Sequence, residues 1–235
     1  MEGRAGSVAP TGKLKHAPPK AARGGACFSL PSKSNSKRVR GFRYSVHHYS
    51  RVNRVPLTEY RRRLPHFHPD GAYLFVTWRL YGSLPVAPPD VIYATPGHAF
   101  AAQDRALARN HGPRSLSDPR VARCVVEAIR TGESPKQFYE LQAWAVMPNH
   151  VHLLVLPRVA LPQITHWLKG RTAREANLLL ERSGEPFWQD ESYDHWVRNE
   201  KEFHRIVAYI EENPVSAGLA ATPEEWSWSS AGGAS

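Results

Sequence analysis

The chain has only two cysteines, Cys27 and Cys124, and no long apolar run among its 235 residues. Two cysteines cannot form a disulfide framework, and these two match no zinc-ligand spacing. Apolar runs such as residues 153–156 are far shorter than the roughly 20 residues that a membrane-spanning helix requires. We therefore expect no disulfide scaffold, no membrane span and a location in the reducing cytoplasm.

Acidic residues are scarce at the start of the chain. Residues 1–63 contain 15 Lys and Arg but only two acidic residues, a balance of +13, whereas the other 172 residues have a balance of −3. Residues 1–58 are rich in Ala, Gly, Pro and Ser and show no hydrophobic period, which predicts a mostly disordered tail. Such a basic tail is typical of attraction to a polyanion, without indicating which one.

Hydrophobic periodicity and turn residues predict a folded body over residues 59–235. The expected strands cover residues 73–80, 139–147 and 150–156, and the expected helices cover about 98–110, 118–130, 162–182 and 199–212. Asp118 and Asn199 are the predicted N-caps of two helices, and Pro214 is predicted to end the last one. Pro148 and Asn149 form a turn that pairs two strands as a hairpin. The order predicts an α+β sandwich in which one helical layer packs on a mostly antiparallel sheet.

The first candidate for chemistry is His150-Val151-His152 in the predicted hairpin. Residues two apart on a strand point to the same face, so both imidazoles project together. Two such imidazoles can chelate a divalent metal that polarises a phosphate or activates water. A second pair of this kind, His66 and His68, weakens the motif, and a solvent-facing pair on a half-exposed sheet is the alternative.

The second candidate is the pair Tyr209 and Asn213 on the predicted last helix. A spacing of four residues brings them to one helical face, where a phenol and an amide oxygen can approach the same metal ion. A tyrosine hydroxyl has a pKa near 10 and needs a cation or a base before it becomes a good nucleophile. Considered alone, these residues also fit a core tyrosine and a helix end.

The third candidate is a basic segment in the predicted helix 162–182. Lys169, Arg171 and Arg174 form a basic edge that can reach phosphates, although a charged helix face is common. Gly170 lies inside the same helix, where glycine costs up to about 1 kcal/mol relative to alanine. Either a close approach of the backbone to a ligand or a kink would explain it.

Taken together, these pieces resemble the IS200-like single-tyrosine transposases of the HUH type, and most closely the REP-associated tyrosine transposases. The matching segments are Arg62-Arg63-Leu64-Pro65-His66, residues 144–152 (Trp-Ala-Val-Met-Pro-Asn-His-Val-His), Leu168-Lys169-Gly170 with residues 172–175, Phe187-Trp188-Gln189, residues 209–215 (Tyr-Ile-Glu-Glu-Asn-Pro-Val) with 217–219, and residues 226–230. They span residues 61–230, although residues 82–117 match only loosely and form an insert of open role.

The resemblance implies a ferredoxin-like sheet and an enzyme, a metal-dependent single-strand DNA endonuclease and strand transferase. By position, Tyr209 would be the nucleophile that forms a 5′-phosphotyrosine. His150, His152 and Asn213 would bind Mg²⁺ or Mn²⁺, of which imidazole suits Mn²⁺ better. The implied partner is single-stranded DNA with palindromic hairpins in the nucleoid, bound by a monomer or a homodimer.

Three alternatives remain open at this point. Tyr193 is a rival nucleophile, ranked below Tyr209 because it has no partner four residues away and no flanking match. The chain can instead be a catalytically inactive DNA-hairpin-binding protein on the same fold. A zinc hydrolase built on histidines is the third possibility. It would need a third imidazole or a carboxylate near the pair, and no His-Glu-x-x-His segment supports it.

Overall fold

The computed structural model describes residues 58–61, 65–84, 96–109 and 112–233. The predicted disordered tail, apart from Thr58, lies outside these residues, as do residues 85–95 and 110–111 of the loosely matching insert at 82–117. Among the described residues, no helix is both long enough and apolar enough to cross a membrane.

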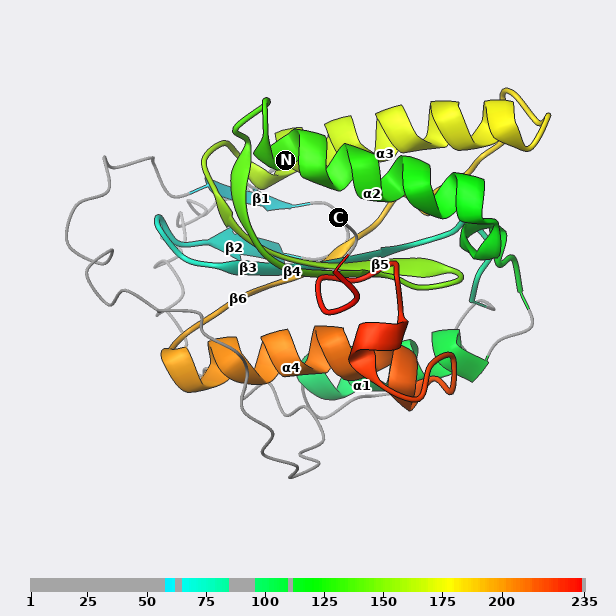
Figure 1. Ribbon diagram of the computed structural model, residues 1–235. Coiled ribbons are helices and arrows are strands. Elements are labelled where there is room, and N and C mark those ends of the chain that lie inside the picture. The colour runs from blue at the N-terminus through cyan, green and yellow to red at the C-terminus, as the bar shows by residue number, and fades with distance from the viewer. Residues whose placement is uncertain (1–57, 62–64, 85–95, 110–111, 234–235) are drawn as a thin grey trace, which may run out of the picture.

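A four-stranded antiparallel sheet forms the centre of the molecule, with strand order β4-β5-β3-β6 (Figure 1). Its strands are β3 (Leu74–Arg79), β4 (Tyr139–Val146), β5 (His150–Pro157) and β6 (Tyr193–Trp196). The helices are α1 (Pro96–Arg109), α2 (Pro119–Glu133), α3 (Leu161–Leu179) and α4 (Glu200–Ser216), with short 3₁₀ helices η2 (Ser115–Ser117) and η3 (Pro223–Glu225). A separate hairpin joins β1 (Thr58–Arg61) to β2 (Pro65–His68).

The ferredoxin-like α+β fold predicted from the sequence is confirmed. The series β3, α2, β4, β5, α3, β6 together with the observed strand order is the split βαβ arrangement. Helices α2 and α3 cover one face of the sheet, whereas α1 and α4 cover the other (Figure 1). The expectation of a single helical layer is therefore wrong, because α1, from the loosely matching insert, and α4 bury the second face.

Strand alternation builds a core on each face of the sheet. Leu74, Val76 and Trp78 of β3 point to the side of α2 and α3, whereas Phe75 packs with Phe100 of α1 on the other side. The same alternation of side chains determines which face of the sheet each polar residue occupies. Even-numbered residues at the start of β5 therefore face α1 and α4, and this positions the two imidazoles.

The predicted helix starts are confirmed, and one predicted helix end is wrong. The Asp118 side chain accepts from the backbone N–H of Arg120, and the Asn199 side chain accepts from that of Glu202. However, α4 continues through Pro214 to Ser216. A proline near the end of a helix removes one backbone hydrogen bond, and this does not stop the last turn from forming. Strand β6 and the β1–β2 hairpin were not expected.

Two helical glycines give a matched pair of stability predictions. A methyl group at Gly132 of α2 would overlap the Tyr139 ring, whereas Gly170 of α3 has open space where its Cβ would be. The described part of the chain therefore makes no close approach to Gly170. Gly132→Ala should destabilise the fold by about 1–3 kcal/mol through overpacking. Gly170→Ala should stabilise it by up to about 1 kcal/mol through helix propensity.

Urea denaturation with an unchanged m-value measures both effects. Equal stabilisation by the two substitutions would contradict the packing of Tyr139 against Gly132.

Candidate metal and nucleophile site

The two imidazoles predicted to act together do lie side by side. His150 and His152 leave the same face of β5, and their Nε2 atoms are 3.1 Å apart. Their exposed fractions are 1% and 0%. The alternative of a solvent-facing pair on a half-exposed sheet is therefore wrong, because α1 and α4 cover this face.

Neighbouring side chains hold both rings by their Nδ1 atoms. Asn149 donates through its Nδ2 to the carbonyl of Leu107, so its Oδ1, 2.7 Å from His150 Nδ1, is the acceptor of a ring N–H. Thr77 Oγ1 of β3 lies 2.8 Å from His152 Nδ1. This pattern assigns the Nδ1–H tautomer to His150 and lets His152 adopt it. Both Nε2 lone pairs then point to one spot, as in metal sites whose ligands are oriented by a second layer of contacts.

Asp104 of α1 completes the cluster and is the residue that sequence reasoning missed. Its Oδ1 lies 3.4 Å from His150 Nε2 and 3.3 Å from His152 Nε2, without accepting a well-aligned hydrogen bond. The side chain is buried. No local pattern marks Asp104 in the sequence, and the only available signal was an acidic residue on the buried face of an amphipathic helix.

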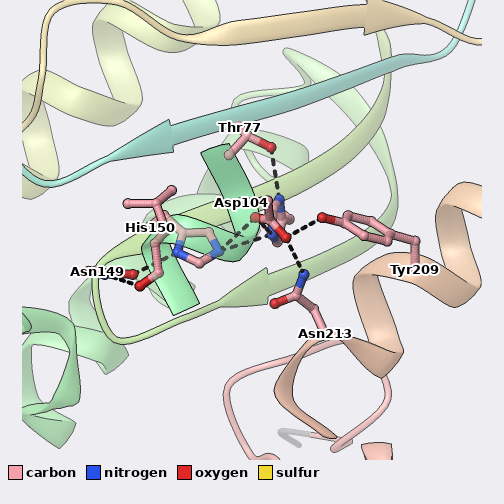
Figure 2. Close-up of polar contacts among 8 residues, drawn as sticks. Thr77, Asp104, Asn149, His150, Tyr209 and Asn213 are labelled. Carbon is pink, nitrogen blue, oxygen red and sulfur yellow. Dashed lines mark hydrogen bonds and ion pairs between the residues drawn. The ribbon is translucent and has the colours of Figure 1, made fainter. Parts of the chain in front are cut away.

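Tyr209 and Asn213 of α4 reach the same carboxylate from the other side (Figure 2). The Tyr209 hydroxyl donates a hydrogen bond to Asp104 Oδ2, and Asn213 Nδ2 donates to that oxygen over 3.2 Å. The Tyr209 ring also packs against His152, with ring centroids 5.6 Å apart. The four predicted residues therefore gather at one centre, with Asp104 between the imidazoles and α4.

The buried charges shift the pKa values of this centre in opposite directions. Burial alone would raise the pKa of Asp104, but the positive charge and Nε2–H groups of the imidazoles, His152 first, hold it well below its usual range when these rings are protonated. Burial, followed by the charge of Asp104, raises the pKa of Tyr209 well above 10. Burial also lowers the pKa of His150, which keeps this ring neutral at neutral pH. The cluster thus combines the carboxylate anion of Asp104, the neutral imidazole of His150, which can offer a lone pair to a metal ion, and the protonated phenol of Tyr209.

This donor set fits a divalent metal ion. Among the described residues, Asp104, His150 and His152 form a group whose ligand atoms lie close enough together to share one ion. Ligand atoms about 2.1 Å from an ion and at right angles to one another are about 3.0 Å apart. The three atom pairs of this cluster, at 3.1–3.4 Å, come close to that spacing. The Asn213 amide contacts Asp104 through its nitrogen, and its role as a metal ligand stays a prediction.

The basic residues predicted to contact DNA lie on α3, which covers the opposite face of the sheet (Figure 1). Lys169 Nζ donates to the carbonyls of Gln189 and Asp190, and Arg171 pairs with Glu175. Arg174 is exposed. The structure does not bring these residues to the imidazoles, so their contact with DNA stays a prediction.

The rival residues have other positions. His68 pairs with Asp194 over 2.6 Å between Nε2 and Oδ2, and the His66 side chain lies outside the described residues. Tyr193 stacks on Phe100, with ring centroids 4.4 Å apart, and lines a cavity beside the site. Tyr209, in contrast, donates its hydroxyl directly to the cluster.

Comparisons with known proteins confirm the resemblance that the motifs indicated. The family described as "Transposase IS200 like" matches residues 118–213, a stretch that contains both imidazoles, Tyr209 and Asn213 but not Asp104. The REP-associated tyrosine transposase of Escherichia coli is 29% identical over 94 residues, 39% of this chain and 53% of that protein. A Haemophilus influenzae relative described by the same family name is 30% identical over 104 residues, 39% of this chain and 58% of that protein.

The chain thus spans about half the length of the curated relatives that it matches. A solved structure of a REP-associated tyrosine transposase bound to a REP hairpin is similar at 22% identity and a TM-score of 0.46. The match covers 74% of this chain and 82% of that one.

The geometry predicts which side chains dominate metal affinity. Asp104→Asn removes the anionic ligand and should weaken Mn²⁺ binding more than Asn213→Ala, which removes a neutral amide that donates to Asp104. Thr77→Val, which removes the support of His152 Nδ1, should weaken binding about 10–100-fold. Titration calorimetry with Mn²⁺ measures all three variants. A larger loss for Asn213→Ala than for Asp104→Asn would contradict this order.

Proposed function

We propose that this protein is a transposase of the REP-associated tyrosine kind, a metal-dependent enzyme that cuts and rejoins single-stranded DNA carrying palindromic hairpins. The observation that carries the proposal is the hydrogen bond from the Tyr209 hydroxyl to Asp104, whose other oxygen lies 3.3 Å and 3.4 Å from the two imidazoles. A nucleophile and a metal-binding cluster thus share one buried centre. The family match over residues 118–213 supports the same assignment.

The proposed reaction conserves the phosphodiester bond. The Tyr209 oxygen attacks the phosphorus of the DNA strand, the bond from phosphorus to the 3′ oxygen breaks, and the 5′ phosphate becomes attached to the tyrosine. The 3′ oxygen leaves with a proton as a free hydroxyl. Attack of a 3′ hydroxyl on the phosphotyrosine then rejoins a strand and frees Tyr209, so no energy cofactor is required.

Asp104 is the residue positioned to take the proton of Tyr209 during attack. Its Oδ2 already accepts the phenolic hydrogen bond, which is the geometry that a general base requires. The low pKa of Asp104 and the raised pKa of Tyr209 keep the proton on the phenol in the resting arrangement. Proton transfer therefore becomes favourable only when the surrounding charge changes.

His150, His152 and Asp104 would hold the Mg²⁺ or Mn²⁺ ion, with Asn213 as the further ligand implied by the resemblance. When bound, such an ion supplies positive charge that neutralises a phosphate oxygen. Imidazole ligands favour Mn²⁺ over Mg²⁺. The E. coli relative is named a REP-associated tyrosine transposase, which supports the repetitive palindromic DNA that the resemblance implies as the substrate. Lys169, Arg171 and Arg174 remain the proposed contacts to its backbone, and the nucleoid is the expected place of action.

A catalytically inactive hairpin-binding protein is the second candidate. The observation that favours it is the nearly complete burial of both imidazoles, which a phosphate must approach. This candidate predicts hairpin binding without any covalent adduct in Mn²⁺ or Mg²⁺.

The decisive experiment removes one phenolic oxygen. Tyr209→Phe should abolish covalent protein–DNA adducts with labelled hairpins in Mn²⁺ while leaving hairpin binding near normal, because the ring keeps its packing. Tyr193→Phe is the matched control and should still form adducts. Denaturing gels detect the covalent product. Adducts that persist in Tyr209→Phe and vanish in Tyr193→Phe would reverse the assignment.

The metal has its own test. Replacing both His150 and His152 with Ala should abolish cleavage in Mn²⁺, because only one strong ligand of the cluster remains. Cleavage at the wild-type rate by this double variant would refute a metal site at the imidazoles.

A further inference from the structure

A cavity of about 220 Å³ lies directly beside the Asp104–imidazole cluster. It is lined by Thr77 and Arg79 of β3, by Asp104 of α1, and by Glu191 and Tyr193 next to and in β6. Pockets for drug-sized ligands hold about 300–1,000 Å³. This cavity is smaller and suits a single compact group, such as a phosphate with part of its sugar.

Arg79 leaves the same face of the sheet as the imidazoles. In the β3–β5 ladder, Thr77 is the partner of His152 and Arg79 is the partner of His150. Directly opposite residues on one face have Cβ atoms about 4.5–5.5 Å apart. The hydrogen bond between Thr77 and His152 confirms that this face is shared. The Arg79 side chain therefore starts beside His150 and extends along the cavity.

The guanidinium of Arg79 lacks an anionic partner within the described part of the chain. Its one hydrogen bond there is to the hydroxyl of Ser83, at 3.4 Å, and no carboxylate lies within ion-pair distance. The side chain is half-buried, and burial lowers its pKa. Charges removed from water are normally paired, and the described part of the chain supplies no anion for this one, so an anionic ligand is a suitable partner.

The other charged groups at the cavity are two carboxylates. Asp104 is engaged by the imidazoles, Tyr209 and Asn213, and Glu191 makes no ion pair with Arg79. Arginine is the side chain best suited to phosphate, because its planar fork donates two parallel hydrogen bonds. An anion with oxygen acceptors therefore fits Arg79 better than any group that the described chain supplies.

We propose that Arg79 binds a backbone phosphate of the DNA strand, the neighbour of the phosphate that Tyr209 attacks, and that the cavity holds this sugar-phosphate unit. Tyr209 packs at the His152 end of the imidazole pair, and Arg79 lies at the His150 end. These ends are two strand residues, about 7 Å, apart. Arg79 thus contacts the next phosphate and sets the position of the strand. This assignment rests on the proposed function, since it takes single-stranded DNA as the ligand.

Salt dependence separates a phosphate contact from a structural role. The probe is a single-stranded oligothymidylate without added metal, and its binding to the full chain is measured by fluorescence anisotropy over a range of salt concentrations. Arg79→Gln should weaken binding by about 10-fold or more. It should also reduce the slope of log K against log salt by about 0.7, the value for one contact to a single strand. Arg79→Lys should restore the slope, because it keeps the charge.

A matched control lies at the far end of β5. Arg158 pairs with exposed Glu140 and lies eight residues from His150, so Arg158→Gln should leave the slope unchanged. Weaker binding by Arg79→Gln with an unchanged slope would overturn the proposal and indicate a structural role. An equal loss of slope in Arg158→Gln would also overturn it, because it would indicate nonspecific attraction.

Glu191→Gln tests the cavity itself. Removing a negative charge from the cavity wall should strengthen oligothymidylate binding, and unchanged or weaker binding would exclude the cavity as the phosphate position.

These assays need neither metal nor cleavage. Absence of any covalent adduct from the wild-type chain would therefore refute the proposed nuclease, while the slope of Arg79→Gln would still decide whether Arg79 binds phosphate.

Discussion

The buried carboxylate of Asp104 is the constraint on which the site depends. Its two oxygens contact side chains from β5 and α4, and its own helix is α1. An unpaired carboxylate in this position would be strongly unfavourable, because desolvation of a charge costs several kcal/mol. The phenol and the amide of α4, and the imidazoles of β5 when they carry a proton, offset that cost only when all three elements are in place. The position of α1 on the sheet is thus coupled to the position of Tyr209.

Register within the sheet is the second requirement. His152 is opposite Thr77 and His150 is opposite Arg79, and all four side chains face α1 and α4 because strand residues alternate. A slip of one residue would turn the imidazoles into the apolar core beneath α2 and α3. The burial of Val151 and Leu153 in that core opposes such a slip. Hydrophobic packing on one face of the sheet therefore holds the polar side chains of the other face in their positions.

Local patterns predicted most elements and marked four residues of the centre as candidates, while their roles came only from the family resemblance. The hairpin, the capped helices, the two imidazoles and the i, i+4 pair Tyr209 and Asn213 depend on periodicities of two and 3.6 residues that can be read directly. Asp104 could not be found this way, because its role arises when α1 packs against strands from a distant part of the chain. The short strand β6 and the last turn of α4 past Pro214 likewise depend on tertiary contacts that outweigh local propensity.

The cluster keeps the Tyr209 phenol protonated. The negative charge that orders the imidazoles also raises the pKa of Tyr209, so the contact that positions the phenol opposes its ionisation. Any positive charge that joins the cluster acts in the opposite direction, because it stabilises phenolate and offsets Asp104. Cavities of about 220 and 130 Å³ lie beside Asp104 and beside His150, so the buried side chains of the cluster are accessible from two sides. In the proposed reaction, Tyr209 therefore becomes reactive only when the charge around Asp104 changes.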